Sequence, residues 1–271
     1  MKRILFSSIV AVGIIALTLN SCKKEKPDTE TQSAVDNNIC ETEFTKVMPA
    51  VNSFGIKENG VRSVQTACPT ITVDSTSIVI PGTKWPRIML IDYGGGCLAD
   101  SIDGKIRKGQ IKCEFSNKWS VVGSRIKVTL INYYVNNIGY ACDSIIISHD
   151  AANTYTNTIY GGKCVSSTWS LEWAATRTLS QTAGTNTPNF PYDDVFQLTG
   201  TANGKNRNGL AYTIATVAPV IKRSSCSWIE SGKLNLTPAG LPVRTIDFGS
   251  GACDNQATIT INGNTFTFTM N

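Results

Sequence analysis

The chain has 271 residues, of which 17% are charged, and its formal net charge of +5 includes Lys2 and Arg3 near the N-terminus. The remaining excess of three positive charges forms no basic stripe, which argues against nucleic-acid binding. Nine cysteines accompany a single histidine, His149, and none of them is spaced as Cys-x-x-Cys, so we expect neither a metal site nor a cofactor.

The first 21 residues predict an export signal. Lys2 and Arg3 precede an apolar run over residues 4–19, which is too short and wrongly flanked for a permanent membrane span. The next residues, Leu19-Asn20-Ser21-Cys22, resemble the lipobox of bacterial lipoproteins. This resemblance implies cleavage before Cys22 and lipidation of that cysteine. The alternative is an ordinary secretory signal that a cysteine follows by coincidence.

Residues 22–39 are predicted to be the lipidated cysteine and a disordered tether, because they are polar and charged at their start and lack an apolar period. Several acyl chains would anchor the protein stably, since each buried methylene contributes about 0.8 kcal/mol. Lys23 is not the aspartate that marks inner-membrane retention in some species. We therefore expect an outer-membrane anchor that faces the periplasm or the cell surface. Residues 40–271 would then form a disulfide-stabilised β domain, either undivided or as two similar halves.

The body of the chain is predicted to be mostly strands. A short helix is indicated at residues 41–54, although Pro49 weakens it. Residues 125–135 are rich in β-branched side chains, and residues 168–178 alternate, with Trp169 and its apolar neighbours on one face. Turn signals recur every 10–15 residues without alternating helices. This pattern favours an all-β antiparallel sandwich or a partly open barrel.

The C-terminal residues predict a hairpin in detail. An Asn262-Gly263 pair separates two alternating runs, and this dipeptide favours a two-residue turn. The turn pairs residue 261 with 264 and residue 259 with 266, which puts the isoleucines and phenylalanines on one face.

Two segments of the chain echo each other. One starts at Cys68 and ends with Ile91-Asp92-Tyr93-Gly94-Gly95-Gly96-Cys97; the other starts at Cys226 and ends with Ile246-Asp247-Phe248-Gly249-Ser250-Gly251-Ala252-Cys253. The simplest interpretation is a hairpin-like unit closed by its own disulfide, Cys68–Cys97 in the first and Cys226–Cys253 in the second. Loops of this length would stabilise each unit by roughly 3–4 kcal/mol.

Four cysteines remain unassigned once Cys22 and these two pairs are set aside. An even number of cysteines in an exported chain favours disulfides. The sequence does not decide how the four pair, and Cys142–Cys164 with Cys40–Cys113 is one of the arrangements that it leaves open.

A second echo joins residues 103–109 and 203–209, which share a Gly-Lys-x-Arg-x-Gly pattern. This motif follows the first cysteine unit but precedes the second, so the two copies are not a simple tandem repeat. The equivalent loops would meet in space through a rearranged internal symmetry. Arg107 and Arg207 are candidates for holding an anion or a carboxylated partner. The alternative is that Lys105, Lys205 and the two arginines simply point outward from hairpins.

The candidate carboxylates are few. Asp92 and Asp247 occupy equivalent places in the repeat and could act as an acid–base pair on a glycoside, but an aspartate before aromatic-Gly is more often a turn residue. Asp193 and Asp194 fall in an expected loop, where they could bind a cation or a sugar, or be a solvated turn. We find no catalytic motif.

Trp119 is the tryptophan that we expect to be exposed, as a stacking surface for a sugar, because its neighbours Asn117, Lys118 and Ser120 are typical of a loop. By contrast, Trp169 and Trp173 lie on one face of an alternating strand and are expected in the core.

The cysteine-bounded repeats and the Gly-Lys-x-Arg-x-Gly turns, from about residue 66 to residue 271, resemble a group of exported, β-rich bacterial lipoproteins with no assigned activity. The resemblance supports the predicted localisation in the cell envelope and implies no catalytic residue. The leading hypothesis is a non-enzymatic, lipid-anchored envelope protein that binds a glycan or a protein partner. The alternatives are a carboxylate-dependent polysaccharide hydrolase and a purely structural envelope component.

Overall fold

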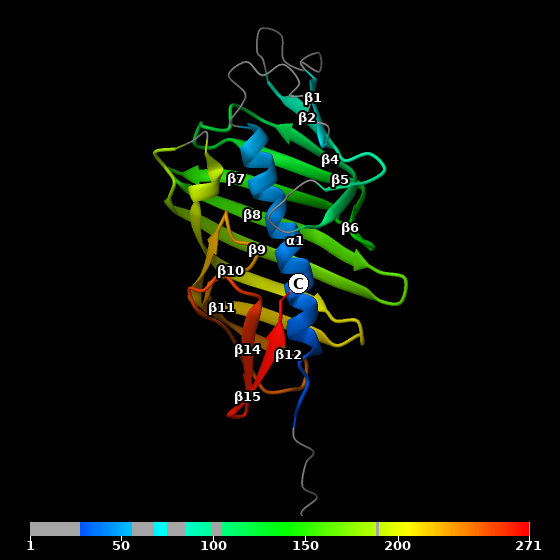
Figure 1. The fold of residues 1–271 in the computed structure, drawn as a ribbon, viewed down its shortest axis with the longest axis vertical. Coiled ribbons are helices and arrows are strands. Elements are labelled where there is room, and N and C mark those ends of the chain that lie inside the picture. The colour runs from blue at the N-terminus through cyan, green and yellow to red at the C-terminus, as the bar shows by residue number, and fades with distance from the viewer. Residues whose placement is uncertain (1–27, 56–67, 75–84, 99–103, 188–189, 271) are drawn as a thin grey trace, which may run out of the picture.

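The computed structural model describes residues 28–55, 68–74, 85–98, 104–187 and 190–270, so the predicted leader and Cys22 lie outside the described residues (Figure 1). Fifteen strands in these ranges form one antiparallel sheet, in the order β1-β2-β4-β5-β6-β8-β9-β10-β11-β12-β13-β14-β15. Strand β3 pairs with β4, and β7 pairs with β5 and β8. The strands are β1 (Thr70–Asp74), β2 (Arg87–Asp92), β3 (Cys97–Leu98), β4 (Ile106–Phe115), β5 (Arg125–Val135), β6 (Ile138–Ala141), β7 (Ser144–Ala151), β8 (Thr154–Val165), β9 (Ser170–Ala183), β10 (Val195–Lys205), β11 (Ala211–Arg223), β12 (Ser231–Pro238), β13 (Arg244–Ser250), β14 (Gln256–Ile261) and β15 (Asn264–Thr269).

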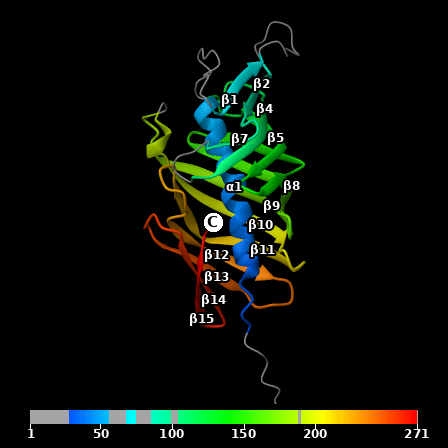
Figure 2. The same ribbon diagram turned by 45° about the vertical axis from the view of Figure 1, so that its right-hand side comes forward.

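The predicted antiparallel β architecture is confirmed, in the form of a single open sheet that does not close into a barrel. The second layer that covers the sheet is a helix and not another sheet. Figures 1 and 2 both show α1 (Gln32–Gly55) running lengthwise over one face of the sheet, across the direction of the strands. Apolar side chains on this face of the strands are therefore buried under α1.

Helix α1 starts earlier and runs longer than the sequence predicts. It has 24 residues and begins at Gln32, so residues 32–39 are helical and their assignment to a disordered tether is wrong. The Glu30 carboxylate caps the helix, because its Oε1 accepts hydrogen bonds from the Ser33 backbone N–H at 2.8 Å and the Ser33 hydroxyl at 3.1 Å. The first turns lack an apolar period because several of their buried side chains are polar and bond to the sheet and its turns, Ser33 to Asn206, Asp36 to Arg207 and Asn37 to Trp173.

The strand predictions hold where the pattern is local. Strand β5 has the predicted bounds, Arg125–Val135, and the inward positions of β9 are buried while its outward positions are not. In the C-terminal hairpin, Ile261 pairs with Asn264 and Ile259 with Phe266, as predicted. Asn262 and Gly263 take φ angles of 49° and 81°, the left-handed conformation that the tight turn requires.

Aromatic packing joins α1 to the middle of the sheet. Phe44 stacks on Trp173 of β9, with ring centroids 5.6 Å apart, and meets Tyr140 of β6 edge-on at 5.8 Å. Gly162 of β8 permits this approach, because a Cβ there would lie 3.3 Å from the Phe44 ring and 2.7 Å from the Trp173 carbonyl oxygen. The buried Trp173 matches its predicted place in the core.

Both predicted disulfides are present, Cys68–Cys97 and Cys226–Cys253. They indicate an oxidising, extracytoplasmic compartment. The first joins the segment before β1 to β3, and the second joins the β11–β12 connection to the segment after β13, so the two units lie toward opposite ends of the sheet. Among the described residues no helix is long and apolar enough to cross a bilayer.

Candidate functional site

The face of α1 that meets the sheet is acidic. Asp36, Glu41 and Glu43 are all buried there, and Asp28 lies just before the helix. A buried carboxylate costs free energy unless a cation and hydrogen bonds compensate it. Each of these four acids has an arginine of the sheet or its turns as its partner, so the helix–sheet interface is a row of ion pairs set among apolar residues.

The central ion pair is bidentate. Arg177 of β9 donates from Nε to Glu41 Oε1 at 2.8 Å and from Nη2 to Glu41 Oε2 at 2.6 Å. Both side chains are almost fully buried, with 3% and 8% of their surface exposed. Beside this pair, Trp173 Nε1 donates a hydrogen bond to Asn37 Oδ1 at 2.8 Å. These contacts fix both the rotation and the position of α1 on β9.

The two echoed motifs supply two further pairs. Arg107 Nη2 lies 3.3 Å from Glu43 Oε2, and Lys105 Nζ donates to Glu43 Oε1 at 2.6 Å. In the other motif, the Arg207 guanidinium donates to Asp36 Oδ1 from Nη2 at 2.5 Å and from Nε at 2.8 Å. The carboxylated partner that the sequence suggested for these arginines is therefore α1 of the same chain.

The fourth motif cation, Lys205, lies apart from the interface: it is about half exposed and 3.6 Å from Glu172. Of the four, this lysine alone fits the alternative of cations that point outward from hairpins.

The ion pair that precedes the helix involves Arg244 of β13, whose side chain is fully buried. Its Nη2 donates to both oxygens of Asp28, at 2.8 and 2.7 Å, and its Nη1 donates to the Pro242 carbonyl oxygen. This contact ties the start of the α1 segment to the far end of the sheet.

A groove of about 450 Å³ opens along one side of α1. The groove is lined mainly by apolar and aromatic residues, among them Ile39, Ile138, Tyr140 and Trp169, together with Lys105 and Arg207. The Arg207 guanidinium lies 4.5 Å from the centre of the Trp169 ring, a cation–π contact. The equivalent loops of the second echo thus meet in space, since each contributes one cation to the same groove.

The groove presents positive charge although its cations are paired. Lys105 and Arg207 keep 19% and 26% of their side-chain surface exposed, whereas their partners Glu43 and Asp36 keep 2% and 0%. The acids therefore lie behind the cations, and among the described residues the lining of the groove contains no carboxylate and no histidine. Trp169, which we expected in the core, is only half-buried because it lines this opening.

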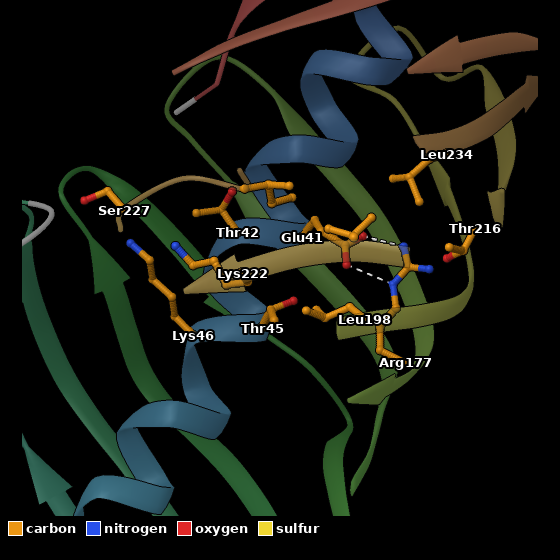
Figure 3. Close-up of a pocket in the computed structure, with 12 residues that line it drawn as sticks. Glu41, Thr42, Thr45, Lys46, Arg177, Leu198, Thr216, Lys222, Ser227 and Leu234 are labelled. Carbon is orange, nitrogen blue, oxygen red and sulfur yellow. Dashed lines mark hydrogen bonds and ion pairs between the residues drawn. The ribbon is translucent and has the colours of Figure 1, made fainter. Parts of the chain in front are cut away.

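A smaller pocket of about 50 Å³ lies on the other side of α1, over strands β9 to β12 (Figure 3). Leu198 and Leu234 contribute to its apolar wall. In Figure 3 the amino groups of Lys46 and Lys222 point toward the Ser227 end of the pocket, and the Glu41–Arg177 pair lies on the other side of it. The Lys222 amino group donates to the carbonyl oxygens of Cys226 and Trp228.

Two polar atoms in this pocket are buried and have no hydrogen-bond partner among the described residues. They are the Thr45 hydroxyl and Nη1 of Arg177, the one terminal nitrogen of that guanidinium that Glu41 does not engage. A buried unpaired donor costs about 1–3 kcal/mol, so the pocket has an unmet capacity to bind an acceptor.

The predicted exposure of Trp119 is wrong. Only 4% of its surface is exposed, because the loop between β4 and β5 folds back and the indole packs on Tyr155, with centroids 5.4 Å apart, and on His149. His149 Nδ1 hydrogen-bonds the Trp119 carbonyl oxygen at 2.9 Å. Loop-like neighbours predicted the loop correctly but not the direction of its one large side chain.

Asp92 and Asp247 lie far apart, and each hydrogen-bonds the backbone that follows it. Each accepts a hydrogen bond from the backbone N–H two residues on, Gly94 at 2.7 Å and Gly249 at 3.0 Å. They lie on β2 and β13, and eight strands separate these two in the sheet, so they cannot flank one glycosidic bond. A hydrogen bond from Lys233 foremost lowers the pKa of Asp247.

Asp193 and Asp194 follow each other at the end of a short 3-10 helix, Pro191–Asp193. Asp193 accepts a hydrogen bond from the Thr187 hydroxyl at 2.6 Å, and the buried Asp194 accepts one from Gln181 at 2.8 Å. Desolvation, and then the charge of Asp193, raises the pKa of Asp194 to about 6. The pair lies apart from both cavities, and nowhere in the described ranges do His, Cys, Asp and Glu residues gather as a metal site.

The remaining cysteines do not adopt the arrangement that the sequence left open. The Sγ atoms of Cys40 and Cys164 lie 2.9 Å apart, and both residues are fully buried. Cys113 is buried on β4, and Cys142 is half-buried just after β6. Cys40 therefore faces Cys164 and not Cys113.

Sequence reasoning missed the acids of α1 together with Arg177 and Arg244. One signal was readable: Arg177 follows Trp173 and Ala175 at the inward positions of an alternating strand, where a charge must find a partner. Comparisons with protein-family models, with curated proteins and with solved structures find no match. The site must therefore be interpreted from its own geometry.

Proposed function

We propose that this chain is an exported, lipid-anchored binding protein without catalytic activity, and that the groove beside α1 binds a glycan that carries carboxylate groups. The proposed export and lipid anchoring rest on the lipobox-like sequence at Cys22, and the two disulfides agree with export. The sequence predicts a glycan ligand of unspecified charge, and the positive charge of the groove favours an acidic one.

One observation carries the ligand class: the groove combines the ring of Trp169 with partly exposed cations whose acids are buried behind them. The half-buried Trp169 offers apolar ring surface for the C–H face of a sugar, and Lys105 and Arg207 offer donors for carboxylates. A volume of about 450 Å³ lies within the range of small-ligand sites.

The alternative of a polysaccharide hydrolase has less support. General acid–base cleavage of a glycoside needs two carboxyl groups about 5–10 Å apart, and the described residues that line the groove supply none. A purely structural role would leave the groove without a ligand, and the same binding experiment tests it.

Thermal unfolding of the oxidised protein with acidic and neutral oligosaccharides tests the proposal. A ligand that binds only the native state raises the midpoint by mass action, so we expect galacturonate oligomers to raise it and uncharged oligomers of equal length to have little effect. Trp169→Ala should remove the shift, while Tyr160→Ala, at an exposed ring outside the groove, should keep it. Equal shifts with both sugars, or none, would contradict the proposed ligand.

The proposed lipid anchoring has a separate test. Cys22→Ala should move the protein from the membrane fraction to the soluble fraction of the cell envelope, because the acyl chains are its proposed anchor. Retention of the variant in the membrane fraction would contradict lipid anchoring without bearing on the groove.

The pocket favours a second candidate, a small amphipathic anion such as a short-chain carboxylate. Its support is the pair of donors on Thr45 and Arg177 that have no partner among the described residues, beside an apolar wall with Lys46 at one end. Thermal shifts with a series of alkyl carboxylates would measure this binding, and no shift up to millimolar concentration would contradict it.

A further inference from the structure

Cys40 of α1 and Cys164 of β8 meet in the middle of the helix–sheet interface. Their sulfur atoms are 2.9 Å apart, and neither residue has exposed surface. Cys164 pairs with Tyr140 on one side and with Leu171 on the other, so it belongs to the interior of the sheet. Helix and sheet are joined here by residues 124 positions apart in the chain.

We infer that Cys40 and Cys164 form a third disulfide, which ties α1 covalently to the centre of the sheet. The sulfur atoms need to approach by only a further ~0.9 Å to reach the bond length of about 2.05 Å. The two terminal disulfides indicate that the protein folds where thiols are oxidised. Burial alone would also suit two free thiols, but the contact selects one partner out of the three cysteines open to Cys40.

The oxidation balances by thiol–disulfide exchange. The two thiols lose two protons and two electrons as the Sγ–Sγ bond forms, and the disulfide of an oxidising oxidoreductase takes up both to become a dithiol. Exchange needs a thiolate, and desolvation foremost raises the pKa of the Cys40 thiol in the folded protein. The bond therefore forms before α1 is fully packed, and afterwards it is shielded from reductants.

The position of the bond connects it to both cavities. Ile39 lines the groove and Glu41 lines the pocket, so Cys40 is the helix residue between them. Fixing Cys40 to β8 fixes the wall of α1 that the two cavities share. This consequence rests on the proposed function, whereas the bond itself does not.

Peptide mapping tests the bond directly. The full chain is purified from an oxidising compartment, alkylated while denatured without reductant, digested and analysed by mass spectrometry. We expect one peptide pair that links Cys40 to Cys164, with neither cysteine alkylated. Recovery of both cysteines in alkylated form, or of either one linked to Cys113 or Cys142, would overturn the inference, and neither outcome depends on glycan binding.

The order of reduction gives a second test on the unmodified protein. Cys253 is exposed, so a mild reductant should open Cys226–Cys253 in the native state, whereas Cys40–Cys164 should open only after denaturant is added. Equal rates of reduction at the two bonds would contradict a bond sealed in the interface.

A pair of variants measures the contribution to stability. Cys40→Ala with Cys164→Ala should lower the unfolding midpoint by about 10 °C, because the bond closes a long loop in the unfolded chain. In this double variant, reduction should lower the midpoint only by the contribution of the other two disulfides. Cys113→Ala, at a buried cysteine outside the contact, controls for the loss of a buried sulfur atom. If the double variant does not fold, the peptide map still decides.

Discussion

At the scale of single residues, the interface depends on charges placed where the strand pattern calls for apolar side chains. Arg177 occupies an inward position of β9 and has 3% of its side-chain surface exposed. Its charge is tolerated there because Glu41 approaches from the helix with two hydrogen bonds. The alternation of β9 could be predicted from the sequence, but the partner could not, because it lies 136 residues away.

The Thr45 hydroxyl is buried without a hydrogen-bond partner in the part of the chain that the structure describes, so removal of this hydroxyl should stabilise the protein. Thr45→Val replaces the hydroxyl by a methyl group of similar size and removes the desolvation penalty. We expect a gain of about 1 kcal/mol in the free energy of unfolding, measured by urea denaturation. Thr42→Val is the matched control on the same helix. A loss of stability at Thr45 alone would indicate that its hydroxyl has a bound partner.

Asp194 should make stability depend on pH in the acidic range. Burial, followed by the charge of Asp193, raises its pKa from 3.8 to about 6, so the folded protein holds this proton more tightly than the unfolded chain does. Its contribution is therefore complete below about pH 4 and is lost as the pH rises through 6. Asp194→Asn should flatten this part of the stability profile, measured by unfolding midpoints between pH 4 and 7.

Asp193→Asn is the control for this titration. It removes the neighbouring negative charge but leaves the desolvation, which is the larger cause of the raised pKa. The slope between pH 4 and 6 should become shallower without vanishing. An unchanged profile in both variants would show that other groups govern the acid range.

At the scale of elements, α1 is held by ion pairs whose order along the helix segment follows the order of strands across the sheet. Asp28 pairs with Arg244 of β13, Asp36 with Arg207 after β10, Glu41 with Arg177 of β9, and Glu43 with Arg107 of β4. The helix therefore contacts strands that lie far apart from one another within the sheet. This arrangement explains why a helix with such a polar buried face is stable at this position.

The Glu41–Arg177 pair should be costly to break and cheap to replace. Glu41→Gln leaves the buried guanidinium without its counter-charge and should lower the free energy of unfolding by about 3–5 kcal/mol. Glu41→Leu combined with Arg177→Met should cost less than that single change, since no charge is then left unpaired. Urea denaturation of the variants measures both.

The exposed Lys205–Glu172 pair provides the comparison. Its side chains are 49% and 62% exposed, so Glu172→Gln should leave the unfolding curve unchanged within error. If Glu41→Gln also left the unfolding curve unchanged, the charges of the interface would contribute little to holding α1 on the sheet.

Elements were predictable wherever the deciding interactions are local. The Asn262-Gly263 turn and its flanking alternation determine the register of the last hairpin, and the β-branched run over residues 125–135 determines β5. The prediction for residues 32–39 is wrong because their helix depends on distant polar partners, Asn206, Arg207 and Trp173, rather than on an apolar period. Trp119 was misplaced for the same reason, since the Tyr155 and His149 rings that cover it lie on other strands.

At the scale of the whole molecule, the two cysteine units that echo each other lie toward opposite ends of one continuous sheet. Their disulfides close local segments and do not connect the ends of the sheet to each other. The middle of the sheet depends on α1 for its second layer, and among the described residues the inferred Cys40–Cys164 bond would be the one covalent link between the layers. The repeated cysteine segments predict the two disulfide pairings, but they do not predict that α1 covers the middle of the sheet.

Removing α1 should therefore unfold the domain as a whole and not merely uncover one face. Without residues 28–55, the aromatic face around Trp173 is exposed and Arg107, Arg177 and Arg244 lose their acids, so the sheet keeps neither its apolar burial nor its charge compensation. We expect loss of the cooperative thermal transition in circular dichroism and strong binding of a hydrophobic dye. Asp36→Asn, which removes one ion pair and leaves the layer in place, should retain a cooperative transition at a lower midpoint. A shortened chain that still melted cooperatively, without binding dye, would show that the sheet is stable by its strand pairing alone and that α1 serves the cavities rather than the fold.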